Sequence, residues 1–166
     1  MNEQYADKKG SDAGAGGEEH AEKLIEQLHA RARELYCGQR LAKRSSAVAI
    51  AETFGRRVTA YHGLATGGYT GDGECGAIVA GRLVLAEFLA DSDPKETKVS
   101  QLADASRRYQ QAVARRIQAQ GSPDFICSSL VAPFEDYDDP ERLSFCCSVV
   151  GDVASIVAEI FYDCKK

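Results

Sequence analysis

Residues 75–90 read CGAIVAGRLVLAEFLA, a strongly apolar run with small residues on one side. The run is longer than a typical strand, so its length predicts a buried helix. Directly before it, residues 61–74 read YHGLATGGYTGDGE and contain five glycines: Gly63, Gly67, Gly68, Gly71 and Gly73. Such a density of glycine is typical of a loop with positive-φ positions or close backbone approaches. The sequence therefore predicts a tight loop that leads into a buried helix.

Two helices are predicted before this loop. Residues 1–17 are small, polar and glycine-rich, which predicts a flexible tail, and residues 18–166 are expected to form one domain. From Glu18 to Cys37, apolar residues recur at steps of three and four, so one helix is expected there. A second helix is expected over residues 41–54, with Gly55 as its C-terminal cap.

Three more helices are predicted after residue 90. Residues 93–96 (DPKE) combine a cap, a proline at the first helical position and a capping-box glutamate, and Gly121 is expected to end that helix. Residues 122–124 (SPD) predict the start of a short helix, and residues 139–140 (DP) that of a long apolar one. No neighbouring segments alternate at period two. The sequence predicts an all-α fold, an irregular bundle of about five or six helices.

Composition and charge exclude several classes of protein. The 166 residues are 44% hydrophobic and 27% charged, an ordinary globular balance, with a net charge of -5. An acidic chain lacks the basic footprint of a nucleic-acid-binding protein. No uninterrupted apolar run approaches the ~20 residues that span a bilayer, and the N-terminus has no apolar signal core. We therefore expect a cytoplasmic location without membrane insertion. Wide apolar stripes are compatible with a homodimer.

The chain has six cysteines, at positions 37, 75, 127, 146, 147 and 164. In a reducing cytosol structural disulfides are a poor explanation, which leaves metal binding, redox chemistry and core packing. No CxxC occurs, so zinc-knuckle and thioredoxin-type motifs are absent, and without CxxCH no c-type haem is expected. The wide spacing neither shows nor forbids that the thiols converge.

Cys75 is the most informative of the six. It lies at a predicted helix N-terminus, where the partial positive charge stabilises a thiolate. The glycines before it allow backbone N–H groups to approach a bound anionic group. Cys127 is placed similarly after residues 123–124. On this reasoning Cys75 is either a metal ligand or an attacking thiolate that Cys127 or Cys146 resolves.

Residues 67–77, GGYTGDGECGA, resemble the signature of the C_GCAxxG_C_C family of redox-active proteins. That family has four characteristic cysteines and a CGAxxG motif after a glycine-rich loop. Cys127, followed by Ser-Ser-Leu, is similar to the third cysteine segment, and Cys146 to the fourth, which opens an apolar helix. Cys37 would be the first. The resemblance covers roughly residues 34–160.

This resemblance implies an all-helical fold and, through a relation to the cluster-bearing part of split-Soret cytochromes, a [2Fe–2S] centre. The implied ligands are Cys37, Cys75, Cys127 and Cys146, with Gly67, Gly68, Gly73 and Gly76 near the cofactor. The chain departs from CGAxxG, because Ala80 stands where the family has glycine and Gly81 follows. Cys147 and Cys164 lie outside the pattern.

Three functions follow from these observations. The first is electron transfer through a cysteine-ligated iron–sulfur cluster to an unidentified redox partner, without substrate turnover. The second is a metal-free dithiol–disulfide protein that uses Cys75, Cys127 and Cys146. The third is a non-redox helical binding or scaffold protein with cysteines in its core. His62 is a candidate donor to a cluster, and the pairs at residues 107–108 and 115–116 are interpreted as a solvated face, or as a dock for an acidic partner.

Overall fold

The computed structural model describes residues 15–38, 40–89, 99–117 and 124–164. These residues form six α-helices and one short 3-10 helix and contain no strand, which confirms the predicted all-α bundle. The helices are α1 (Ala15–Cys37), α2 (Ser46–Thr53), α3 (Gly76–Leu89), α4 (Val99–Arg116), α5 (Cys127–Val131) and α6 (Pro140–Asp163), with the 3-10 helix η1 (Ala60–Leu64) between α2 and α3.

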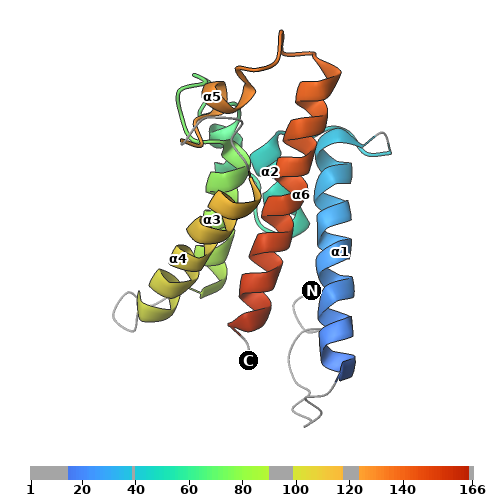
Figure 1. Ribbon diagram of the computed structural model, residues 1–166, viewed down its shortest axis with the longest axis vertical. Coiled ribbons are helices and arrows are strands. Elements are labelled where there is room, and N and C mark those ends of the chain that lie inside the picture. The colour runs from blue at the N-terminus through green and yellow to red at the C-terminus, as the bar shows by residue number, and fades with distance from the viewer. Residues whose placement is uncertain (1–14, 39, 90–98, 118–123, 165–166) are drawn as a thin grey trace.

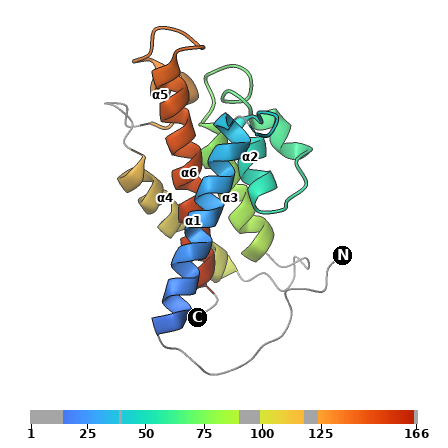
Figure 2. The same ribbon diagram turned by 90° about the vertical axis from the view of Figure 1, so that its right-hand side faces the viewer.

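Helix α6 is the centre of the bundle (Figures 1 and 2). Helix α1 runs antiparallel along one side of it, and α3 and α4 pack on another. Residues 153–158 of α6 are all buried, so this part of the helix is enclosed on every side by its neighbours. By length and composition α6 could also cross a membrane, and 56% of its apolar window is buried inside the protein. The absence of membrane insertion stays a prediction.

The crossing of α3 with α4 and α6 depends on Gly81. A Cβ atom at this position would meet the Tyr109 hydroxyl and would lie 2.7 Å from a methyl group of Val153. Tyr109 is completely buried, and its hydroxyl donates a hydrogen bond to the Ile78 carbonyl oxygen at 2.8 Å. Close packing at this point therefore requires a residue without a side chain.

The ends of several helices test the capping predictions. Asp139 caps α6, because its carboxylate accepts a hydrogen bond from the Glu141 N–H at 2.8 Å, as predicted. Gly55 has a φ of 65°, as expected for the residue after a helix C-cap. The prediction for α2 was wrong at its start: α2 begins at Ser46, after an extended Ser45, and Leu41 is 45% exposed. The apolar residues at helical spacing therefore begin before the helix itself does.

Other predicted boundaries differ or cannot be compared. Helix α1 begins at Ala15, inside the range predicted as a tail, and α5 begins at Cys127, after the predicted start. The predicted start at residues 93–96, the predicted end at Gly121, residues 122–123 and tail residues 1–14 lie outside the described residues.

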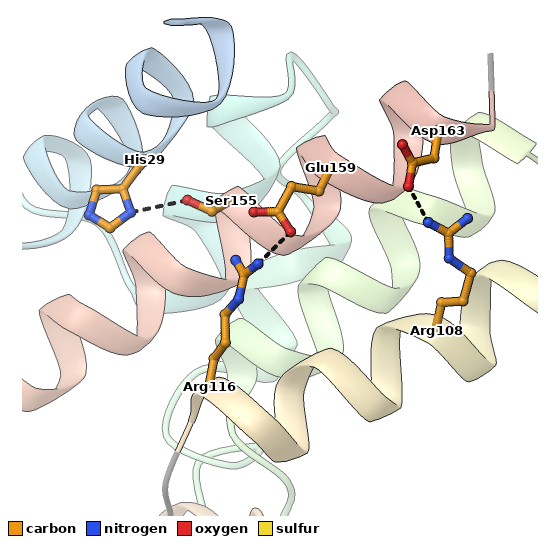
Figure 3. Close-up of polar contacts among 6 residues, drawn as sticks. All are labelled: His29, Arg108, Arg116, Ser155, Glu159 and Asp163. Atoms are coloured by element: carbon orange, nitrogen blue, oxygen red, sulfur yellow. Dashed lines mark hydrogen bonds and ion pairs between the residues drawn. The ribbon is translucent and has the colours of Figure 1, made fainter. Parts of the chain in front are cut away.

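Two arginines of α4 pair with carboxylates of α6 (Figure 3). Arg116 lies 2.5 Å from Glu159, and Arg108 contacts Asp163 one turn further along α6. On α4 itself, Arg107 pairs with Asp104 at 2.6 Å. These pairings favour the interpretation of the arginine pairs as a solvated face. They also leave fewer unpaired arginine charges that an acidic partner could bind.

The Arg116→Gln variant should therefore unfold almost like the wild type. We expect the free energy of unfolding to fall by less than about 1 kcal/mol, because both members of the pair are exposed to solvent and screened. Urea unfolding followed by circular dichroism measures this change. A loss above about 2 kcal/mol would mean that the pair is a structural element.

Candidate functional site

Two segments that are distant in sequence are held together next to the start of α3. Glu74 and Ile126 form an isolated antiparallel bridge. The Cys75 N–H donates to the Phe125 carbonyl oxygen at 2.7 Å, and the Cys127 N–H donates to the Gly73 carbonyl oxygen at 2.9 Å. These backbone hydrogen bonds place Cys75 and Cys127 on two segments of the chain that lie side by side.

The glycine-rich loop makes this pairing sterically feasible. Gly67, Gly68 and Gly71 have φ values of 59°, 73° and 81°, which confirms the predicted positive-φ loop. A Cβ at Gly67 would lie 2.6 Å from the Gly73 carbonyl oxygen and 3.0 Å from the Cys127 Cβ. The two ends of the loop therefore touch through their backbones, directly beneath Cys127.

Three of the predicted thiols line a single cavity of about 450 Å³: Cys75, Cys127 and Cys146. The lining residues come from the end of α1 and from the starts of α2, α3, α5 and α6. These helix ends lie toward the top of the bundle in Figure 1. The Tyr36 hydroxyl, from the last turn of α1, is hydrogen-bonded to the Cys146 thiol. Thus five helices contribute to a space that three sulfur atoms face.

The four glycines predicted to lie near a cofactor differ in whether they line the cavity. Gly76 lines the cavity and packs against the Leu64 carbonyl oxygen, where a Cβ would collide. Gly67 and Gly73 do not line it, and they hold the loop closed under Cys127. A Cβ at Gly68 would have its nearest neighbour at 3.9 Å. The loop therefore positions the thiols, and Gly76 alone of the four borders the space they face.

Burial sets the protonation of the thiols. It raises the pKa of Cys75 to about 12, although the N–H groups of Ala77 and Ile78 donate to its sulfur and lower it. The expectation of a stabilised thiolate at Cys75 was therefore wrong in its net direction, because desolvation outweighs the helix N-terminus. Burial also raises the pKa of Cys127 and of Cys146, and Arg142 opposes the rise at both.

Cys37, the fourth predicted ligand, does not line the cavity. It forms a disulfide with Cys147 that joins the end of α1 to α6, across 110 residues of sequence. Structural disulfides are a poor explanation of cysteines in a reducing cytosol, and this pairing was not predicted from the sequence. Cys146 therefore lines the cavity, whereas Cys147 lies in the disulfide, since adjacent residues on a helix point about 100° apart.

The remaining candidates lie away from the thiols. Cys164 is at the opposite end of α6, and His62 is exposed in η1 and does not line the cavity. Within the described ranges, no group of three or more His, Cys, Asp or Glu side chains is close enough together to hold a single metal ion. The three thiols surround a space and do not converge on one point.

Sequence reasoning missed the basic side of this cavity. Lys43, Arg44 and Arg142 line it together with Tyr36 and the three thiols, and no aspartate or glutamate within the described ranges does. One signal was available for Arg142, which precedes Cys146 by four residues on the same helix and so shares its face. Nothing comparable in the sequence links Lys43 to the thiols.

Comparisons with models of protein families, with curated proteins and with solved structures gave no match.

Proposed function

We propose that this protein carries electrons through an iron–sulfur cluster held by Cys75, Cys127 and Cys146. The observation behind the proposal is the cavity that these three thiols share, although they come from three separate segments of the chain. A fold that needed cysteine only as a small core residue would have no reason to gather three of them around one space.

The donor set has the chemistry that such a cluster requires. Thiolates are the usual ligands of iron–sulfur clusters, and the part of the chain that the structure describes brings no carboxylate to the cavity that would favour a harder metal ion. Cluster ligands bind different irons, so they need not all reach a single point. When bound, the cluster would supply reversible one-electron transfer. The [2Fe–2S] type follows from the family resemblance alone.

The chain's own groups would hold the sulfur atoms and adjust their charge. Tyr36 is hydrogen-bonded to the Cys146 sulfur, and the N–H groups of Ala77 and Ile78 donate to the Cys75 sulfur. Hydrogen bonds to ligand sulfur stabilise the more negative, reduced state. Val149 and Val150 line the cavity from α6 and add apolar surface to it.

The fourth ligand is a separate question. Cys37 would have to leave its disulfide with Cys147 before it could bind iron, and it follows Tyr36, which does line the cavity. Its role as a ligand stays a prediction. A reducing cytoplasm, the location we propose, would favour the open form of this disulfide.

The dithiol–disulfide alternative has weaker support. A thiol with a pKa of about 12 is almost entirely protonated at neutral pH, and the thiolate is the nucleophile in disulfide exchange. A metal instead displaces the thiol proton when it binds. The scaffold alternative leaves the shared cavity without an explanation.

Anaerobic reconstitution with iron and sulfide tests the proposal. We expect the reconstituted wild type to contain near-stoichiometric iron and acid-labile sulfide and to absorb in the visible region. The Cys146→Ser variant should lose most of the iron and sulfide, because it removes one of the three thiols of the cavity. The Cys164→Ser variant is the matched control, from the other end of the same helix, and should retain both.

Two results of this experiment would count against the proposal or refine it. A wild-type protein that stays colourless and iron-free after reconstitution excludes the cluster. Loss of iron in Cys37→Ser would add Cys37 to the ligand set, whereas retention would show that the three cavity thiols suffice.

A further inference from the structure

The thiol cavity is positively charged, in a chain whose net charge is -5. Among the described residues, its lining includes Lys43, Arg44 and Arg142 and no carboxylate. The same three cations also line a neighbouring cavity of about 370 Å³, to which the described part of the chain contributes one carboxylate, Asp138. Arg44 is compensated by Glu52 at 2.8 Å. The ion pairs found among the described residues include neither Lys43 nor Arg142.

Arg142 is the most unusual of these cations. Only 8% of it is exposed, its guanidinium stacks on the Tyr137 ring at 3.8 Å, and one of its nitrogens donates to the Tyr137 carbonyl oxygen. A buried cation without a counter-charge is costly, so proteins pair buried charges. An anion that entered the cavity would supply the missing negative charge.

The start of α2 adds hydrogen-bond donors to the lining of the same cavity. Ser45 and Ser46 both line the cavity, and the Ser45 hydroxyl is buried without a hydrogen-bond partner. Ser45 occupies the N-cap position of α2, and its side chain caps no backbone N–H. A helix start that borders a cavity lined by cations is an arrangement that binds anions well.

We infer that this cavity binds a small oxyanion, through Arg142, Lys43 and the Ser45 hydroxyl. A tetrahedral phosphate-like group matches the planar fork of the guanidinium and accepts from hydroxyl donors at the same time. The group is either a free inorganic ion or the charged end of a small organic molecule. The inference goes beyond electron transfer and does not depend on a cluster.

Calorimetric titration of the metal-free protein with inorganic phosphate tests the inference. We expect saturable one-site binding, which Arg142→Gln weakens by about tenfold or more because a charge-assisted hydrogen bond is lost. The Arg116→Gln variant is the control, since Arg116 does not line the cavity and pairs with Glu159. Lys43→Gln changes an exposed residue and so tests the site even if Arg142→Gln does not fold.

The outcomes separate the possible sources of the oxyanion. Tighter binding of phenyl phosphate than of inorganic phosphate assigns the site to the end of an organic ligand, and the reverse order assigns it to the free ion. The inference fails if neither compound binds, or if Lys43→Gln and Arg142→Gln bind phosphate as the wild type does. The triple Cys75→Ser, Cys127→Ser, Cys146→Ser variant should keep phosphate binding while it loses iron, so a failed cluster and a failed oxyanion site are distinguishable.

Discussion

Replacing Gly67 by alanine is expected to lower the free energy of unfolding by about 3 kcal/mol. About 1 kcal/mol comes from the left-handed backbone, with a φ of 59°, which a Cβ disfavours. The rest, about 2 kcal/mol, comes from the new Cβ, placed 2.6 Å from the Gly73 carbonyl oxygen. That oxygen cannot move freely, because it accepts the hydrogen bond from the Cys127 N–H at 2.9 Å.

Gly68→Ala is a matched control for this substitution. Its φ of 73° carries a similar backbone penalty, but the nearest atom to its Cβ is 3.9 Å away. We therefore expect Gly68→Ala to cost only about 1 kcal/mol. Urea unfolding curves of both variants measure the difference. Equal costs would show that the close approach of Gly67 to Gly73 is absent in solution.

The second large effect is expected at Gly81. An alanine there should lower the free energy of unfolding by about 2 kcal/mol, because its Cβ would collide with the Tyr109 hydroxyl and Val153. Alanine gains about 1 kcal/mol over glycine in a helix interior, and this gain is already subtracted. Thermal and urea unfolding measure the loss. Gly63→Ala, with no atom within 4 Å of its Cβ and an ordinary φ, should change stability by less than about 0.5 kcal/mol.

A double-mutant cycle identifies the cause of the Gly81 effect. Tyr109→Phe removes the hydroxyl that the new methyl group would meet, at the expense of the hydrogen bond to Ile78. If the collision is responsible, the two substitutions together should cost less than the sum of their separate costs. Strict additivity would place the strain elsewhere, for example against Val153.

Much of the fold could be predicted because helix ends and apolar faces depend on residues that are close together in the sequence. The Asp139-Pro140 cap and the run that forms α3 needed no knowledge of their neighbours. The start of α2 could not be predicted in this way. Leu41 continues the apolar period of that helix, yet it lies on the surface, because tertiary packing begins only near Ser46.

The site was less predictable because its contacts are non-local. The sequence singled out Cys75 and Cys127, but the backbone pairing that brings them together joins segments about fifty residues apart. Helical geometry indicated that Cys146 and Cys147 face different ways, whereas only the packing of α6 decides which one faces the cavity. In the sequence Arg142 resembles an ordinary surface charge, and only the structure shows that Tyr137 covers it.

The antiparallel contact between α1 and α6 has a consequence during synthesis. Cys37 and Cys147, which mark this contact, are 110 residues apart, so α1 leaves the ribosome long before its partner exists. At a translation rate of ~5–20 residues per second, the apolar stripe of α1 is without α6 for on the order of ten seconds. Over that interval its buried positions, Ala32 and Leu35 among them, face solvent or a chaperone. The helix that closes the core is therefore translated after the helices on which it packs.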